Sequence, residues 1–171
     1  MDDIEVVEYN RLWPALFQEE RLQLSGQLAD EELLAIEHFG STAVPGLAAK
    51  PIIDVLIAVP SVPLAKVRFV PKLEALGYVF WPDNPKQDRL FFVKGMPPFG
   101  ARRTHHVHVA EQSSEMWARL KFRDYLINNP AERDAYGRLK RRLAKQYVED
   151  REAYTEAKGE FISRIMKLAT V

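Results

Sequence analysis

A run of eight residues, apolar except for a single carboxylate, constrains this fold more than any other stretch. Residues 52–59 read IIDVLIAV, in which Asp54 is the one polar residue. Strands that are covered on both faces are apolar throughout, so the run predicts a central strand of a sheet with helices on both sides. An ionised carboxylate in such a strand needs a partner, because burying it unpaired costs several kcal/mol. We therefore interpret Asp54 as a functional residue; a structural partner or an exposed strand end is the alternative.

The rest of the chain predicts an α/β (α+β) fold, in which a small mixed sheet is flanked by helices. A helix expected over residues 61–76 would turn Leu64, Val67 and Leu73 inward. At 171 residues the chain has the size of one domain (residues 1–171), with a sheet core over about 30–111 and a C-terminal three-helix unit over about 112–171. Further strands are expected over residues 33–38, 78–81, 89–94 and 102–110, and a first helix over 10–28.

Composition excludes several classes of function. The 24 basic and 24 acidic residues cancel, so the overall charge does not attract nucleic acid, and the basic run over residues 138–145 is expected to be a solvated face. The absence of cysteine excludes disulfides, thiolate catalysis and cysteine-type zinc sites. No apolar run approaches the roughly 20 residues that span a bilayer, and the acidic start over residues 1–5 does not resemble a secretion signal. We expect a cytoplasmic protein with no membrane partner.

A glycine-serine turn before the central strand predicts phosphate binding. Gly40 has no Cβ, so the backbone can approach a phosphate closely, and the hydroxyls of Ser41 and Thr42 add hydrogen-bond donors. Lys50 stands directly before the apolar strand and offers an ammonium group; an exposed loop cation is the alternative. Asp54 would then hold a divalent cation against the phosphate.

A second chemical stretch follows at residues 102–110. On a strand, His106 and His108 project from one face, while Val107 and Val109 project into the core. Two imidazoles at i and i+2 can ligate one metal ion with Asp54 from a neighbouring strand, although a lone histidine is usually structural. Glu37, near the end of the expected first strand, is a further candidate metal ligand or else a salt-bridge partner.

Two tyrosine-lysine pairs occur in the C-terminal helical part. Tyr136 and Lys140, like Tyr154 and Lys158, are four residues apart and so share a helix face. If both faces meet over the sheet, they provide two ammonium groups for a triphosphate and two rings for a base. The alternative is that each tyrosine packs in the core while each lysine extends to water.

These motifs resemble those of a known family. The run HFGSTAVPGLAAKPIID over residues 38–54 closely resembles the signature of the GrpB family, poorly characterised proteins placed in the nucleotidyltransferase superfamily. The resemblance extends through residues 76–78, 106–109 and 122–126 and through both tyrosine-lysine pairs, and thus covers nearly the whole chain. It implies a sheet of nucleotidyltransferase type, a nucleotide or other phosphorylated small molecule as ligand, and a divalent metal ion.

The sequence departs from the superfamily's metal-binding pattern. That pattern has two carboxylates at i and i+2 on the strand after the turn, and Leu56 stands where the second is expected. One carboxylate and two imidazoles favour a softer ion such as Zn²⁺, Mn²⁺ or Fe²⁺ over Mg²⁺. The first hypothesis is a nucleotidyltransferase-like enzyme with Asp54, His106 and His108 as catalytic or metal-binding residues. A catalytically inactive nucleotide or metabolite binder and a metal-dependent phosphohydrolase are the alternatives.

Overall fold

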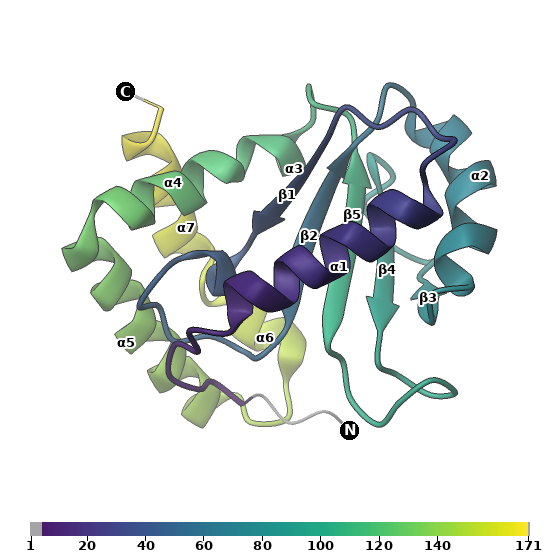
Figure 1. Cartoon of the computed structure of the whole chain (residues 1–171). Helices are drawn as coiled ribbons and strands as arrows, with labels where there is room; N and C mark the ends of the chain where they lie inside the picture. Colours follow the sequence, from purple (N-terminus) through teal and green to yellow (C-terminus); the bar gives the residue numbers. More distant parts are fainter. Residues whose placement is uncertain (1–4, 171) are drawn as a thin grey trace.

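The computed structural model describes residues 5–170 and has a mixed sheet at its centre (Figure 1). Residues 1–4 and residue 171 lie outside the described part. The prediction that the acidic start over residues 1–5 is not a secretion signal therefore falls mostly outside the described residues. The described strands lie in the order β1-β2-β5-β4-β3; β2 and β5 are parallel and the other neighbours are antiparallel. Their bounds are β1 Ala35–Phe39, β2 Ile53–Ala58, β3 Tyr78–Phe80, β4 Arg89–Lys94 and β5 His105–Ala110.

The apolar run lies in β2, between β1 and β5, as the sequence predicts. One face of the sheet carries the main core, where Val55, Ile57, Val107 and Val109 are fully buried. Helix α1 (Trp13–Gln27) crosses the strands in Figure 1, and it covers this face together with α2 (Val62–Glu74). These helices shield the uniformly apolar side of β2 from water.

The inward face of α2 differs from the one expected. Leu73 is fully buried as predicted. Leu64 is 55% exposed and Val67 is 75% exposed, so the prediction that these two residues face inward is wrong. The buried stripe runs through Ala65 and Phe69 instead. Phe69 is the largest apolar side chain buried along the helix, and placing it against the sheet turns the two smaller residues to solvent.

The C-terminal part consists of helices that group beside β1 in Figure 1. The three helices expected there are present, but the first and third are each divided in two by a short turn. Together with the mixed sheet, they confirm the predicted fold class. Their bounds are α3 Glu115–Ala118, α4 Leu120–Asn128, α5 Pro130–Gln146, α6 Arg151–Glu156 and α7 Gly159–Leu168.

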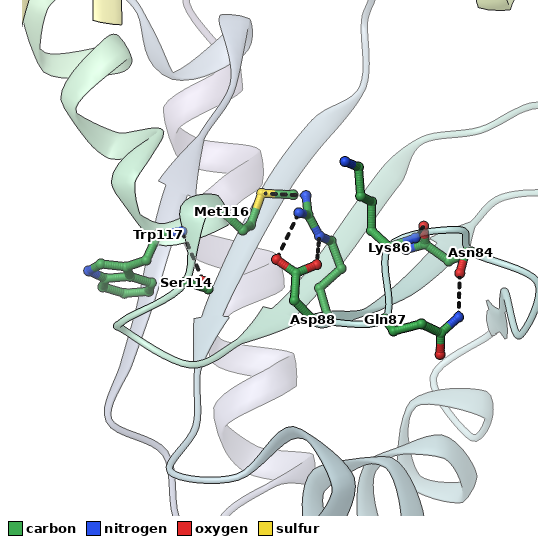
Figure 2. Close-up of polar contacts among 8 residues, drawn as sticks. Asn84, Lys86, Gln87, Asp88, Ser114, Met116 and Trp117 are labelled. Atoms are coloured by element: carbon green, nitrogen blue, oxygen red, sulfur yellow. Dashed lines mark hydrogen bonds and ion pairs between the residues drawn. The ribbon is translucent and has the colours of Figure 1, made fainter.

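A buried arginine ties β4 to α3 on the second face of the sheet (Figure 2). Arg89 donates from Nε and Nη2 to the two carboxylate oxygens of Asp88, at 2.8 and 3.0 Å, and its Nη1 lies 3.7 Å from the Met116 sulfur. Met116 packs in turn on Leu56 of β2. These contacts fix the first C-terminal helix against the face that carries Asp54.

Candidate functional site

The sheet register brings the candidate metal ligands together. Across the parallel pair, Asp54 lies opposite His106, and Leu56 lies opposite His108. Residues that lie opposite one another in a sheet share a face, so Asp54, His106 and His108 all project away from the main core. Their ligand atoms lie within 4.8 Å of one another, and the three side chains are partly buried.

Two ring nitrogens in this cluster have no hydrogen-bond partner. His106 Nδ1 lies 3.1 Å from Asp54 Oδ1, whereas His106 Nε2 and His108 Nδ1 are buried without any partner among the described residues. When Nδ1 carries the proton and donates to Asp54, Nε2 of the same ring has a free lone pair. The cluster therefore presents two unsatisfied nitrogens and one carboxylate, a donor set that fits a divalent metal ion.

Burial sets the charge state of this cluster. It lowers the pKa of His108 to about 3, so this imidazole is neutral at neutral pH, the form that ligates metals. For Asp54, burial alone would raise the pKa, but the hydrogen bond with His106 and the neighbouring imidazoles outweigh it and lower the pKa. An anionic carboxylate beside the neutral imidazole of His108 attracts a cation.

Glu37 lies on the same sheet face, opposite Leu56, but outside this cluster. Its Oε2 accepts a hydrogen bond from Arg123 Nη1 at 2.9 Å, and the same nitrogen donates to the His38 carbonyl oxygen at 2.7 Å. Glu37 thus forms the salt bridge that the sequence predicts as the alternative to metal ligation. It anchors the end of β1 directly before the glycine-serine turn.

The turn itself is packed against the carboxylate of the cluster. Gly40 has φ +72°, and a Cβ placed there would lie 2.5 Å from Asp54 Oδ2. Only glycine therefore allows the chain to pass this close to Asp54. Ser41 and Thr42 then form the start of a short 3₁₀ helix, η1 (Ser41–Ala43), and Thr42 Oγ1 lies 2.9 Å from His38 Nε2.

A cavity of about 300 Å³ opens between this turn and the C-terminal helices. Most of the predicted phosphate- and substrate-binding residues line it, together with two cations that the sequence reasoning did not select, Arg103 and Arg151. Its lining residues are Ser41, Thr42, Ala49, Lys50, Ile52, Asp54, Arg103, His106, Lys140, Arg151, Tyr154, Thr155 and Lys158.

Lys140 is the most unusual group in this cavity. The residue is only 3% exposed, and its Nζ is buried with no hydrogen-bond partner among the described residues. It lies 4.8 Å from the ring centroid of Tyr136. Burial, followed by the positive charges of Lys158 and Arg141, lowers its pKa well below the usual value.

Two further lysines meet at the ring of Tyr154. Lys50 Nζ lies 4.4 Å and Lys158 Nζ 4.3 Å from its centroid. Burial and the nearby Arg151 lower the pKa of Lys50 to about 7, and burial lowers that of Lys158 to about 8 despite the opposing effect of Asp54. Lys50 is thus a partly buried cavity residue and not the exposed loop cation that was its alternative.

Some predicted site residues lie beside the cavity and not in its lining. Tyr136 is 4% exposed, stacked on Phe161 at 5.0 Å and in edge contact with Phe122 at 5.3 Å. Tyr136 thus packs in the core, which the sequence predicts as the alternative to contact with a base. Gly40 and His108 are also outside the lining. Gly40 packs directly against Asp54, and His108 belongs to the metal-ligand cluster with Asp54 and His106.

The two missed arginines differ in how far the sequence signals them. Arg151 precedes Tyr154 by three residues and Lys158 by seven, a helical spacing that places all three on one side. Arg103 falls within the strand expected over residues 102–110, whose alternation would turn it toward the core with Val107. The observed strand β5 begins only at His105, so Arg103 precedes it and lines the cavity instead.

The fold and site together define an α+β protein with an acid-histidine cluster at the floor of a cationic cavity. The sequence profile of the GrpB family, described as GrpB protein, matches residues 3–168. The crystal structure of the conserved protein GrpB from Enterococcus faecalis superposes with a TM-score of 0.85 at 37% identity, covering 96% of each chain. The chain belongs to the GrpB family, which confirms the resemblance seen in the sequence.

Two curated relatives are longer than this chain. A UPF0157 protein of Pseudomonas aeruginosa is 49% identical over 165 residues, which cover 96% of this chain and 67% of the relative. The UPF0157 protein YqkA of Bacillus subtilis is 40% identical over 160 residues, covering 93% of this chain and 45% of the relative. Within residues 5–170, no helix has the length and apolar character needed to cross a membrane.

Proposed function

We propose that this protein binds a nucleotide or another phosphorylated small molecule, together with a divalent metal ion, in the cavity between the sheet and the C-terminal helices, and is nucleotidyltransferase-like in this sense. The observation that carries the proposal is Lys140, a buried ammonium group without a hydrogen-bond partner that lines a cavity rich in cations. Burial of this amine disfavours its charged form in the free protein, and an anionic ligand removes that penalty.

The residues of the cavity divide into two sets. Ser41, Thr42 and Lys50 offer hydroxyl and ammonium donors for phosphate oxygens, and Lys140 and Lys158 approach from the helical side. Asp54 and the two histidines would hold the metal ion on the sheet. A bound divalent ion would polarise a phosphoryl oxygen and neutralise part of its charge.

A second candidate is binding without turnover. Leu56 is fully buried where a second carboxylate would be needed, and the carboxylate of Glu37 opposite it is paired with Arg123. With one carboxylate available, a two-magnesium mechanism lacks ligands.

A phosphohydrolase is the third candidate. Release of phosphate without transfer of a nucleotide to any acceptor would identify it.

Thermal unfolding with nucleoside triphosphates, each with and without Mg²⁺, Mn²⁺ or Zn²⁺, tests the proposal directly. A ligand at about 100 times its dissociation constant stabilises the folded state by about 2.7 kcal/mol, which raises the melting temperature of a protein of this size by about 5–11 °C. We expect this shift for the wild type and for the control Asp83→Ala, an exposed turn residue, but not for Asp54→Ala. Absence of any shift in the wild type would refute the proposal.

A further inference from the structure

Three lysine ammonium groups converge on the cavity with little to balance them. Lys50, Lys140 and Lys158 line it together with two guanidinium groups, and Asp54 is the one carboxylate of the lining. The ammonium nitrogens of Lys50, Lys140 and Lys158 lie 4.4, 4.8 and 4.3 Å from the centroids of tyrosine rings. One phosphate group carries roughly two negative charges, so balancing the three lysines in the charged form that an anion favours calls for more than one phosphate.

The aromatic rings near the cavity do not provide a stacking surface for a base. Tyr136 is enclosed by Phe161 on its face, by Phe122 at its edge and by Lys140. Tyr154 is 1% exposed and its ring is in contact with two lysines. Recognition of a base usually requires a free ring face or a specific set of hydrogen bonds.

The remaining lining also suits a phosphate chain. Beside the cations, the metal-ligand residues Asp54 and His106 and the enclosed Tyr154, it consists of the hydroxyl groups of Ser41, Thr42 and Thr155 and two apolar side chains, Ala49 and Ile52. At about 300 Å³ the cavity lies at the small end of the range for small-molecule sites, roughly 300–1,000 Å³. A phosphate chain fits this space and this chemistry, while a nucleoside attached to it would extend outside.

We infer that the site recognises a polyphosphate chain and does not read a base, so that its ligand class is a triphosphate whose nucleoside, if present, stays outside the cavity. The inference rests on the proposed function and narrows it. The unpaired Lys140 and the enclosed tyrosines are the observations that carry it.

Isothermal titration calorimetry with tripolyphosphate, ATP, GTP, CTP and UTP, all in one Mn²⁺ buffer, tests the inference. We expect the five dissociation constants to agree within about threefold, because stacking of a base would favour the nucleotide by about five- to 150-fold. A nucleotide that binds more than about tenfold tighter than tripolyphosphate, or than the other nucleotides, overturns the inference but leaves the proposed function intact. If tripolyphosphate and all four nucleotides fail to bind, both the inference and the proposed function are refuted.

Lys140→Met provides a second readout in the same titrations. It should weaken binding of all five ligands by one common factor, because it removes a contact to the shared phosphate chain. Lys145→Met, the same substitution at an exposed position of α5, is the matched control and should leave every dissociation constant unchanged. A loss in Lys140→Met that is confined to one nucleotide would contradict base-independent recognition.

Discussion

Replacing Lys140 by methionine is expected to stabilise the fold while it weakens ligand binding. The side chain is 3% exposed and its Nζ has no hydrogen-bond partner among the described residues. Burying a polar group without a partner costs about 1–3 kcal/mol, and methionine fills a similar space with an apolar chain. The contact with the Tyr136 ring offsets about 2 kcal/mol when the amine is charged, a state in which burial also costs more than it does for a neutral polar group. We therefore expect the free energy of unfolding to rise by about 1–2 kcal/mol, and the melting temperature by about 2–8 °C.

The effect should depend on pH in a defined direction. Because the pKa of Lys140 is lower in the folded than in the unfolded state, the unfolded chain binds more protons below about pH 10, and wild-type stability rises with pH through this window. The advantage of Lys140→Met should thus be larger at about pH 7 than at about pH 9.5. Urea unfolding followed by fluorescence of the three tryptophans measures both values. A variant no more stable than the wild type, with Lys145→Met unchanged as control, would refute the reasoning.

Two further predictions concern the turn and the lysines. Gly40→Ala should abolish metal-dependent ligand binding, because its Cβ would lie 2.5 Å from a carboxylate oxygen of the metal-ligand cluster; Gly26→Ala, with nothing within 4 Å of the added Cβ, should bind normally in the same titration. Full affinity in Gly40→Ala would show that the close approach is unimportant. The affinity for tripolyphosphate should fall as the pH rises from about 7 to about 9.5, because Lys50 and Lys158, with pKa values of about 7 and about 8, lose the charge that the anion requires. Calorimetry in buffers of different ionisation enthalpy should then show proton uptake on binding, and a pH-independent affinity without uptake would contradict this assignment.

Much of the fold follows from local patterns in the sequence. The run over residues 52–59 predicts β2, and alternation over 102–110 places His106 and His108 on one face of β5, as observed. The phase of α2 was harder to predict. Leu64 and Val67 have the right character to face inward, and it is the fit of Phe69 against the sheet that turns them outward. Local periodicity does not contain this tertiary choice.

The candidate site depends more strongly on contacts between distant segments. Spacing indicates that Tyr154 and Lys158 share a side, and they stay together although the helix breaks between them. It does not show that Lys140, 86 residues after Asp54, loses its water and lines the same cavity. Nor does it show that Arg123 pairs with Glu37, because that contact is made only when α4 packs beside β1. Such convergence is a property of the packed fold.

The most direct test of the account is a crystal structure of the protein grown with Zn²⁺ and tripolyphosphate, with the metal located by its anomalous scattering. The account predicts a zinc ion at about 2.0–2.2 Å from ligand atoms of Asp54, His106 and His108, with phosphate oxygens between it and the ammonium group of Lys140. A zinc ion bound elsewhere, or a cavity without phosphate density in a crystal that contains both at saturating concentration, would contradict it.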